Sequence, residues 1–317
     1  MSASQGARKV GIVGVGKIAL DQHIPSIEET QLFALGALVS QRGIGRPGVP
    51  TFRSLGEMLA ACPDVEAVAI CTPPDIRHGL AREALAAGRH VLLEKPPAAT
   101  TTELRDLVAA ARDTRRTLFA TWHSQHNAAV EAARARLAGR QVRSIQVTWK
   151  EDVRRWHPGQ EWIWQAGGFG VFDPGINALS ILTRILPFPL FVERAELLFP
   201  AGRDTPIAAS LSFRAPAEAG LREAGAEFDW RQEGEQTWTI AVETAEGTLL
   251  QLSRGGACLA VDGRVVAEEA EAEYRHIYRR FHALIEAGES DVDAAPLHLV
   301  ADAFLVGRRC ETAPFVW

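Results

Sequence analysis

The sequence predicts an α/β protein of two domains, in which a doubly wound parallel sheet precedes an α+β domain with an open, largely antiparallel sheet. Its 317 residues exceed the usual size of one domain. Up to residue 122, short apolar runs alternate with segments of helical periodicity, which is typical of a parallel sheet covered by helices. From residue 123 onward, strand-like runs predominate. We therefore predict domains at 1–122 and 123–317.

The first predicted domain opens with a short apolar run, a glycine turn and a segment whose apolar residues have helical spacing. The predicted strands cover residues 9–14, 32–40, 67–71, 90–93 and 118–121, and the predicted helices cover 18–28, 54–61, 76–87 and 102–112. Gly88 is the expected C-terminal cap of one helix. Because each strand is followed by a helix, the strands are expected to be parallel.

The second predicted domain contains many strands and few helices. The expected strands cover residues 144–149, 192–198, 208–213, 226–230, 237–244 and 247–253, and a helix over 128–137 precedes them. The Ala-, Glu- and Gly-rich segment 215–225 is predicted to be a loop. Helices over 274–287 and 296–309 close the chain, and the C-terminal helix could pack back on the first domain.

Composition and charge exclude several classes of function. A net charge of -5 and a pI near 6.0 argue against a nucleic-acid partner, because binding phosphates requires a basic surface. Membrane spans need roughly 20 consecutive apolar residues, and no such run is present. The cysteines form no spacing typical of a metal site. We therefore expect a cytoplasmic protein with a small ligand, no membrane partner and no metal.

A glycine motif follows the first predicted strand directly. Gly14, Gly16 and Ala19 match G-x-G-x-x-A at the point where the first helix begins. The first glycine permits a tight turn, the second lets the backbone approach a pyrophosphate, and the small Ala19 lets helix and strand lie close together. The motif predicts a dinucleotide site. A glycine turn without a ligand is the alternative.

The end of the second predicted strand indicates which dinucleotide is bound. An NAD enzyme ordinarily has Asp or Glu there, whereas this chain has Ser40, Gln41 and Arg42. A hydroxyl and a guanidinium can bind a 2′-phosphate, which a carboxylate would repel. NADP is therefore favoured and NAD remains possible. The alternative is that Arg42 is only a solvated loop residue.

Two proline turns close the third and fourth predicted strands. They are Cys71-Thr72-Pro73-Pro74 and Glu94-Lys95-Pro96-Pro97, and ligands of open parallel sheets bind at these carboxyl ends of strands. Lysine is rare in this chain, so Lys95 is a candidate catalytic residue, although an ion pair with Glu94 is the alternative. The candidate cofactor-binding residues are Gly14, Gly16, Lys17, Ile18, Ser40, Gln41, Arg42, Cys71, Thr72, Pro73, Pro74, His78, Glu94, Lys95 and Pro96.

These motifs together resemble the glucose-fructose oxidoreductase and inositol dehydrogenase family, and the resemblance covers essentially the whole chain. In that family the Lys of the E-K-P turn works with an Asp and a His, four residues apart, from the second domain. Asp173 matches the Asp, but Asn177 stands where most members have His. The resemblance therefore implies that either Asp173 or Lys95 is the general base.

The segments 121–124, 149–160 and 172–177 are similar to one bacterial subgroup of that family, the L-arabinose and D-galactose 1-dehydrogenases. This resemblance implies an enzyme that oxidises C1 of an aldose to a lactone, with NADP favoured by the residues after the second strand, and the family resemblance implies a homo-oligomer formed through the open sheet. It implies that Lys95 and Asp173 are catalytic, and that the sugar is bound by Lys95, Glu151, His157, Asp173 and Asn177. To these matched positions we add His123 and Trp230 as candidate wall residues of the sugar site.

The residue types agree with a sugar site. Each sugar hydroxyl donates and accepts hydrogen bonds, so its pocket needs carboxylate, amide and imidazole groups together. Aromatic faces can cover the C–H surface of the ring, and the segment 122–164 is rich in Trp, although core packing is the alternative. Two other functions stay open: a non-catalytic NADP-binding sensor, and a dehydrogenase or reductase of another polyol such as a cyclitol.

Overall fold

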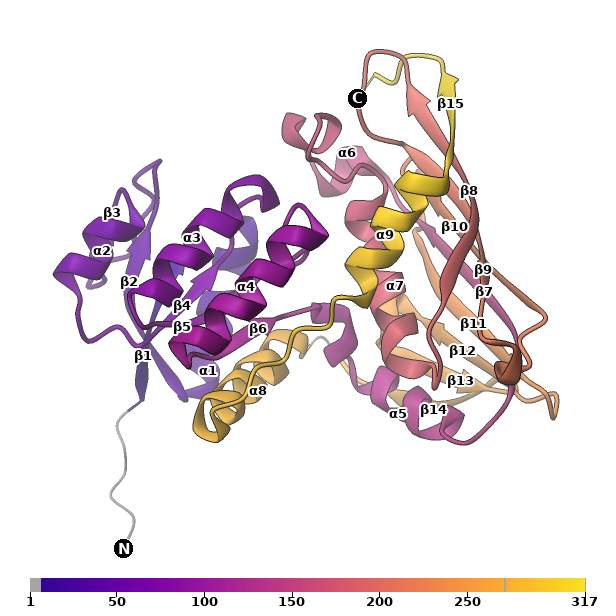
Figure 1. Ribbon diagram of the computed structural model, residues 1–317, viewed down its shortest axis with the longest axis horizontal. Helices are drawn as coiled ribbons and strands as arrows, with labels where there is room; N and C mark the ends of the chain where they lie inside the picture. Colours follow the sequence, from indigo (N-terminus) through magenta and orange to yellow (C-terminus); the bar gives the residue numbers. More distant parts are fainter. Residues whose placement is uncertain (1–6, 271, 317) are drawn as a thin grey trace, which may run out of the picture. The chain divides into compact units, whose positions relative to one another are not determined.

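A computed structural model describes residues 7–270 and 272–316, which form two compact units. Of the described residues, the first unit comprises 7–123 and 273–293, and the second comprises 124–270, 272 and 294–316. Figure 1 labels their helices and strands. The segment 273–293, which follows most of the second unit in the sequence, belongs to the first unit. Each unit is described separately below.

The first unit contains a six-stranded sheet in the order β3-β2-β1-β4-β5-β6, and every strand pair in it is parallel. The strands are β1 (Arg8–Val13), β2 (Phe33–Val39), β3 (Thr51–Phe52), β4 (Ala67–Ile70), β5 (His90–Leu93) and β6 (Leu118–Ala120). The chain moves outward from β1 in both directions, so the carboxyl ends of β1 and β4 meet at the point where the strand order reverses. This confirms the predicted doubly wound sheet.

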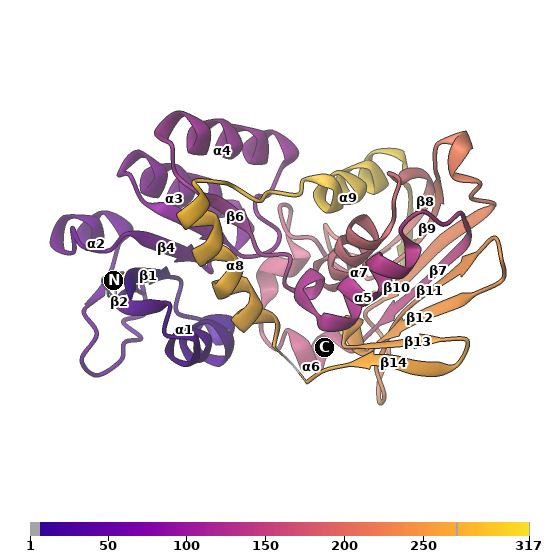
Figure 2. The same ribbon diagram turned by 90° about the horizontal axis from the view of Figure 1, so that it is seen from below.

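Helices cover both faces of this sheet. Alternate residues of β1 point to opposite faces and contribute to two different apolar clusters. One cluster joins Val10 and Ile12 of β1 to α1 (Ile24–Thr30) and α8 (Glu273–Ala287). The other joins Val13 of β1 to α2 (Leu55–Ala61), α3 (Pro74–Ala86) and α4 (Thr101–Thr114). Figure 2 shows α8 beside α1. Burial on both faces explains why these strands are continuous apolar runs.

The first predicted helix differs from expectation at its start. Residues Ala19–His23 form a π-helix, and only then does the α-helix α1 begin. An extra residue in a helical turn rotates the side chains that follow it, and such turns are frequent at functional sites. In this one, His23 becomes fully buried.

The second unit contains a nine-stranded sheet in the order β14-β13-β12-β11-β7-β10-β9-β8-β15, in which only the pairs β7–β10 and β8–β15 are parallel. This confirms a largely antiparallel sheet. Its strands are β7 (Val142–Lys150), β8 (Phe191–Pro200), β9 (Ala208–Arg214), β10 (Glu223–Asp229), β11 (Thr237–Thr244), β12 (Leu249–Ser253), β13 (Cys258–Val261), β14 (Arg264–Glu268) and β15 (Arg308–Thr312).

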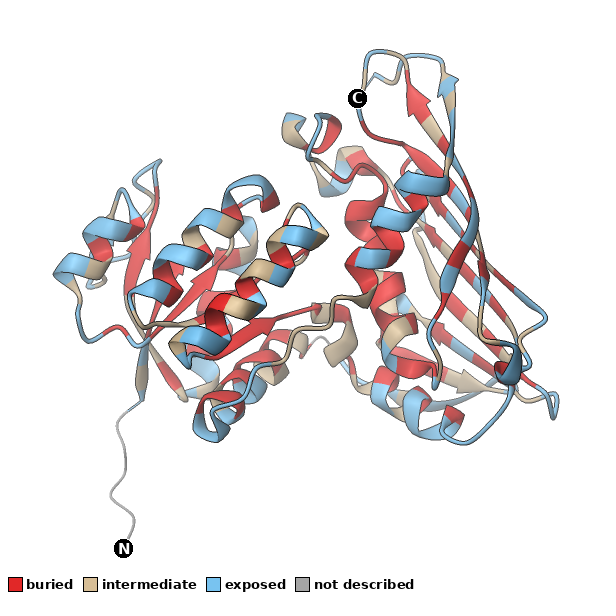
Figure 3. Ribbon diagram, viewed as in Figure 1, coloured by how far each residue is buried: buried red, intermediate tan, exposed pale blue. Residues whose placement is uncertain are grey.

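Helices α5 (Ala128–Leu137), α7 (Phe172–Ile185) and α9 (Ala295–Val306) lie against one face of this sheet (Figure 1). Figure 3 shows that most of α7 is buried. The short helix α6 (Val153–Trp156) follows β7. Two predictions were wrong in part. A helix was predicted over 296–309, but α9 ends at Val306 and residues 308–312 form β15. A loop was predicted over 215–225, but β10 begins at Glu223. Helix α7, together with β13 and β14, was not predicted.

In the part of the chain that the structure describes, no helix has the length and apolarity needed to cross a membrane.

Candidate functional site

The glycine turn after β1 has the geometry that its first glycine predicts. Gly14 has a φ of 92°, and a Cβ atom there would lie 3.0 Å from both the backbone N and Cγ2 of Thr72. A side chain is therefore excluded by conformation and by space. The backbone N–H of Gly14 donates to Val39 O of the neighbouring strand β2 at 3.0 Å. The turn is thus fixed between β2 and the segment that follows β4.

Gly16 differs, because nothing in the protein itself requires a glycine at this position. Its φ is not positive, and a Cβ atom there would have no neighbour within 4 Å. The open space beside the backbone fits the close approach of a pyrophosphate. Lys17 is exposed and pairs with Asp21, and Ile18 precedes the π-helix. The turn therefore fits a dinucleotide.

The segment after β2 holds one buried and two exposed candidates. Ser40 is buried, and its Oγ accepts a hydrogen bond from the backbone N–H of Ile44 at 3.0 Å. Gln41 and Arg42 are exposed, and the backbone oxygen of Gln41 accepts from Arg53.

The two proline turns lie side by side, since β4 and β5 are paired. Thr72 is buried, and its Oγ1 has no hydrogen-bond partner in the described part of the protein. Pro73 is the N-terminal cap of α3 and Pro74 its first residue, while His78 of that helix pairs with Asp106 at 2.8 Å. Cys71 and Lys95 are partly buried. The carboxyl ends of β1, β4 and β5 thus bring together Gly14, Thr72 and Lys95.

The Glu94 carboxylate lies in a buried polar network below the turn that carries Lys95. Its Oε1 is 3.0 Å from His23 Nε2 and accepts from the Tyr274 hydroxyl at 2.8 Å. Its Oε2 accepts from the backbone N–H of Lys95 at 3.2 Å. His23 Nδ1 lies 2.8 Å from the Tyr278 hydroxyl. His123, which ends the first unit, stacks on the Tyr274 ring with centroids 5.9 Å apart.

Charge and hydrogen bonding decide the protonation of this network. Burial raises the pKa of Glu94, but the hydrogen bonds from His23 and Tyr274 outweigh it and lower the pKa to about 2. Burial lowers the pKa of His23, yet its neighbours Cys71, Tyr278 and Glu94 raise it well above 6.5. Burial and the adjacent Glu94 raise the pKa of Tyr274. The hydrogen bond between His23 and Glu94 thus favours the charged form of both side chains. The sequence analysis did not identify His23, Tyr274 or Tyr278.

In the second unit, His157 and Asp173 form the centre of the predicted sugar-binding group. His157 Nε2 lies 3.5 Å from Asp173 Oδ2, and both side chains are largely buried. The rings of His157 and Trp230 have centroids 5.3 Å apart. Asp173 lies in the first turn of α7, whereas His157 follows α6 and Trp230 follows β10. Three separate segments thus converge on this pair.

Asn177 Oδ1 and Trp230 Nε1 are polar atoms of this group that are buried without a hydrogen-bond partner in the described part of the protein. Asn177 follows Asp173 by four residues on α7, so the two share a helix face. Buried polar atoms are almost always paired. Asn177 Oδ1 is an acceptor and the indole N–H of Trp230 is a donor, so the hydrogen-bonding capacity of both atoms is unused within the described residues.

Glu151 is held by a residue that the sequence analysis did not identify. The indole N–H of Trp238 on β11 donates to Glu151 Oε2 at 3.0 Å. Trp238 is also in ring contact with Trp149 and Trp156. Among the tryptophans of the segment 122–164, Trp122, Trp149 and Trp164 are buried, which agrees with the core-packing alternative.

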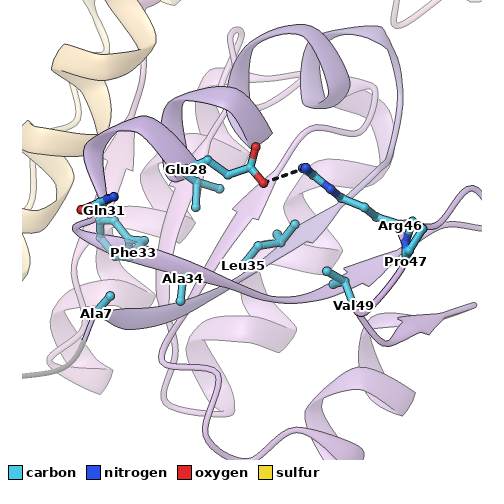
Figure 4. Close-up of a pocket in the computed structure, with 10 residues that line it drawn as sticks. Ala7, Glu28, Gln31, Phe33, Ala34, Leu35, Arg46, Pro47 and Val49 are labelled. Carbon is cyan, nitrogen blue, oxygen red and sulfur yellow. Dashed lines mark ion pairs between the residues drawn. The ribbon is translucent and has the colours of Figure 1, made fainter.

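A surface pocket between α1 and β2 contains none of the predicted site residues (Figure 4). Arg46 and Glu28 form an ion pair beside it, with Nη2 and Oε1 2.8 Å apart. Across residues 7–270 and 272–316, no group of three or more His, Cys, Asp or Glu side chains is placed to hold a metal ion.

Comparisons with known proteins agree with the predicted family. Residues 8–122 match the oxidoreductase family with an NAD-binding Rossmann fold. The chain is 49% identical over 312 residues to galactose 1-dehydrogenase of Pseudomonas fluorescens, covering 97% of this chain and 98% of the relative.

Solved structures give the same result. The crystal structure of a D-galactose-1-dehydrogenase protein from Rhizobium etli is 52% identical, covers 100% of both chains and superposes with a TM-score of 0.94. A 3-ketoreductase from Actinomadura kijaniata, KijD10, in complex with TDP-benzene and NADP, covers 96% of this chain and 99% of its own at 19% identity and a TM-score of 0.79, a likeness of fold alone. The resemblance found in the sequence is thus confirmed, and the chain belongs to the oxidoreductase family with an NAD-binding Rossmann fold.

Proposed function

We propose that this chain is an NADP-preferring aldose 1-dehydrogenase, which oxidises C1 of L-arabinose- or D-galactose-type sugars to the lactone. The observation that carries the proposal is the group around His157 and Asp173, where a buried carboxylate and imidazole 3.5 Å apart adjoin the unpartnered polar atoms of Asn177 and Trp230. Such a set of donors and acceptors beside an aromatic ring suits a sugar. The names of the two most similar relatives described above support the same substrate class.

The reaction needs a proton acceptor for the C1 hydroxyl. The nicotinamide supplies the hydride acceptor when it is bound. In the proposal, Asp173 takes the C1 hydroxyl proton, and Lys95 donates a hydrogen bond to the C1 hydroxyl or the ring oxygen. A neutral Lys95 could take the proton instead. Glu151, His157 and Asn177 orient the other hydroxyls.

The family pattern has His at the position of Asn177, so no imidazole is present at that position in this chain. His157 lies close enough to Asp173, at 3.5 Å, to provide an imidazole from a different segment. A proton accepted by the carboxylate would thus have a basic group beside it. This supports Asp173 as the first choice of base.

NADP is the proposed cofactor because Ser40, Gln41 and Arg42 carry no negative charge against a 2′-phosphate. Purified protein should show a higher kcat/KM with NADP than with NAD at saturating sugar. A clear preference for NAD would reject this part of the proposal.

An aldose panel tests the function directly. L-arabinose, D-galactose, D-xylose and D-fucose are each mixed with protein and NADP, and the reduced nicotinamide is followed by its absorbance. Turnover of at least one aldose with release of a lactone supports the proposal. Turnover only of a cyclitol would assign another polyol substrate, and NADP binding without any turnover would indicate a sensor. Sedimentation of the same sample tests the expected homo-oligomer.

A further inference from the structure

Arg77 of α3 is a buried cation that the proposed reaction does not use. Its side chain belongs to the first turn of the helix and the residue is only 3% exposed. A positive charge in the first turn of a helix opposes the helix dipole, and burying a charge is unfavourable without strong partners. The groups that the guanidinium binds must therefore offset the cost of burying its charge.

Those groups are backbone oxygens of both proline turns. Nη1 of Arg77 donates to Glu94 O at 2.6 Å and also to Pro96 O, while Nη2 donates to Thr72 O. The two oxygens bound by Nη1 belong to the residues on either side of Lys95. The N–H of Lys95 itself donates to Glu94 Oε2 at 3.2 Å. The backbone is thus held before, at and after the lysine.

We propose that Arg77 is a positioning residue for Lys95, which fixes the turn around the lysine and joins it to the turn at Thr72. The planar guanidinium is suited to this task, because it directs several N–H groups at fixed angles, whereas an ammonium is a point charge on a flexible chain. This inference rests on the proposed function, in which Lys95 contacts the sugar.

The first test measures Lys95 without any turnover. The chain has lysine only at positions 9, 17, 95 and 150, so reductive methylation with ¹³C-formaldehyde gives few NMR signals. The variant Lys95→Arg identifies the Lys95 signal by its loss. In Arg77→Met, the Lys95 signal should change its chemical shift, while the other lysine signals stay in place. Arg82→Met is the matched control, because Arg82 lies on the same helix but is half-exposed and pairs with Asp106.

The second test uses kinetics on the sugar and NADP. Arg77→Met should lower kcat about 10- to 100-fold, the loss expected from misplacing a reacting group by about an ångström, with KM changed less than roughly threefold. Arg77→Lys keeps the charge but not the fork, so it should lose part of kcat and shift the Lys95 signal less. If Arg77→Met does not fold, Arg77→Lys provides the test of the positioning role.

The two tests separate the inference from the function on which it rests. If the wild-type protein oxidises no aldose, the proposed function fails, and the Lys95 signal still reports on Arg77. If folded Arg77→Met or Arg77→Lys retains both the wild-type Lys95 signal and the wild-type kcat, Arg77 has no positioning role and the inference is overturned.

Discussion

Nε2 of His23 lies 3.0 Å from Oε1 of Glu94, and both residues are buried. His23 ends the π-helix that follows the glycine turn, and Glu94 directly precedes Lys95. Because both side chains are shielded from solvent, the attraction between their charged forms is stronger than that of a surface pair. The pair therefore joins the predicted dinucleotide turn to the turn that carries the candidate catalytic lysine.

Glu94→Gln should change how stability depends on pH. The pKa of Glu94 is about 2 in the folded protein against an ordinary 4.5, so its contribution to stability is present above pH 4.5 and is lost as the pH falls toward 2. The shift corresponds to about 3 kcal/mol. The variant should be less stable than wild type at pH 7, and the difference should shrink on acidification from pH 4.5. Urea denaturation at several pH values measures it.

Glu286→Gln is the matched control for this prediction. Glu286 pairs with Arg8 in the same unit, but its side chain is 47% exposed, and exposed pairs contribute little. Its loss should leave the free energy of unfolding nearly unchanged. Equal effects of the two substitutions would contradict a special role for the buried pair.

The two glycines of the turn should respond differently to alanine. Gly14→Ala forces a side chain into a φ of 92° and against Thr72, so stability should fall by about 1–3 kcal/mol. Gly16→Ala meets no neighbour within 4 Å, so stability should be unchanged, whereas NADP binding should weaken about tenfold or more. Thermal unfolding and a fluorescence titration with NADPH measure the two effects. Normal NADPH affinity in folded Gly16→Ala would argue against the proposed pyrophosphate site.

The first unit was predictable because its strands are buried on both faces and read as apolar runs such as Ala67–Ile70. The second unit was less predictable. Pro174 and Gly175 in the first turn of α7 interrupt the helical pattern, and β10 buries the small residues Ala224 and Ala226 beside Phe228. Propensity is a weak guide where tertiary burial decides the structure.

The candidate site was predictable where a motif is local. The turns at Gly14 and Lys95 each follow a strand directly, so their place at the carboxyl ends of the sheet follows from the sequence. The residues that hold those turns could not be found in this way. Tyr274 reaches Glu94 across 180 positions of the chain, and Trp238 reaches Glu151 across 87. Contacts of that kind depend on the tertiary fold and have no characteristic residue spacing in the sequence.

Trp238→Phe should weaken sugar binding through Glu151. The substitution keeps an aromatic ring but removes the N–H that donates to Glu151 Oε2 at 3.0 Å. A hydrogen bond to a charged group contributes about 1.5–3 kcal/mol, so KM for the sugar should rise roughly tenfold or more, with a smaller change in kcat. Trp156→Phe is the control, because Trp156 bonds to Gln236 instead. An unchanged KM in Trp238→Phe would show that Glu151 needs no such support, or does not bind the sugar.

The identity of the general base is decided by comparing Asp173 with Lys95. If Asp173 is the base, Asp173→Ala should lower kcat about 10²- to 10⁴-fold, the usual contribution of general-base catalysis. His157→Asn should lower kcat less, because Nε2, which lies 3.5 Å from the carboxylate, is not the first proton acceptor.

Lys95→Ala should suppress turnover while leaving NADPH affinity nearly intact, since Gly14 and Gly16 form the proposed dinucleotide turn. The pH profile of kcat in each variant then shows which of the two residues is the base. The variant that lacks the base loses the limb of the profile that reports the ionisation of the base. Near-normal turnover in Asp173→Ala, with the acidic limb retained, would move the role of base to Lys95.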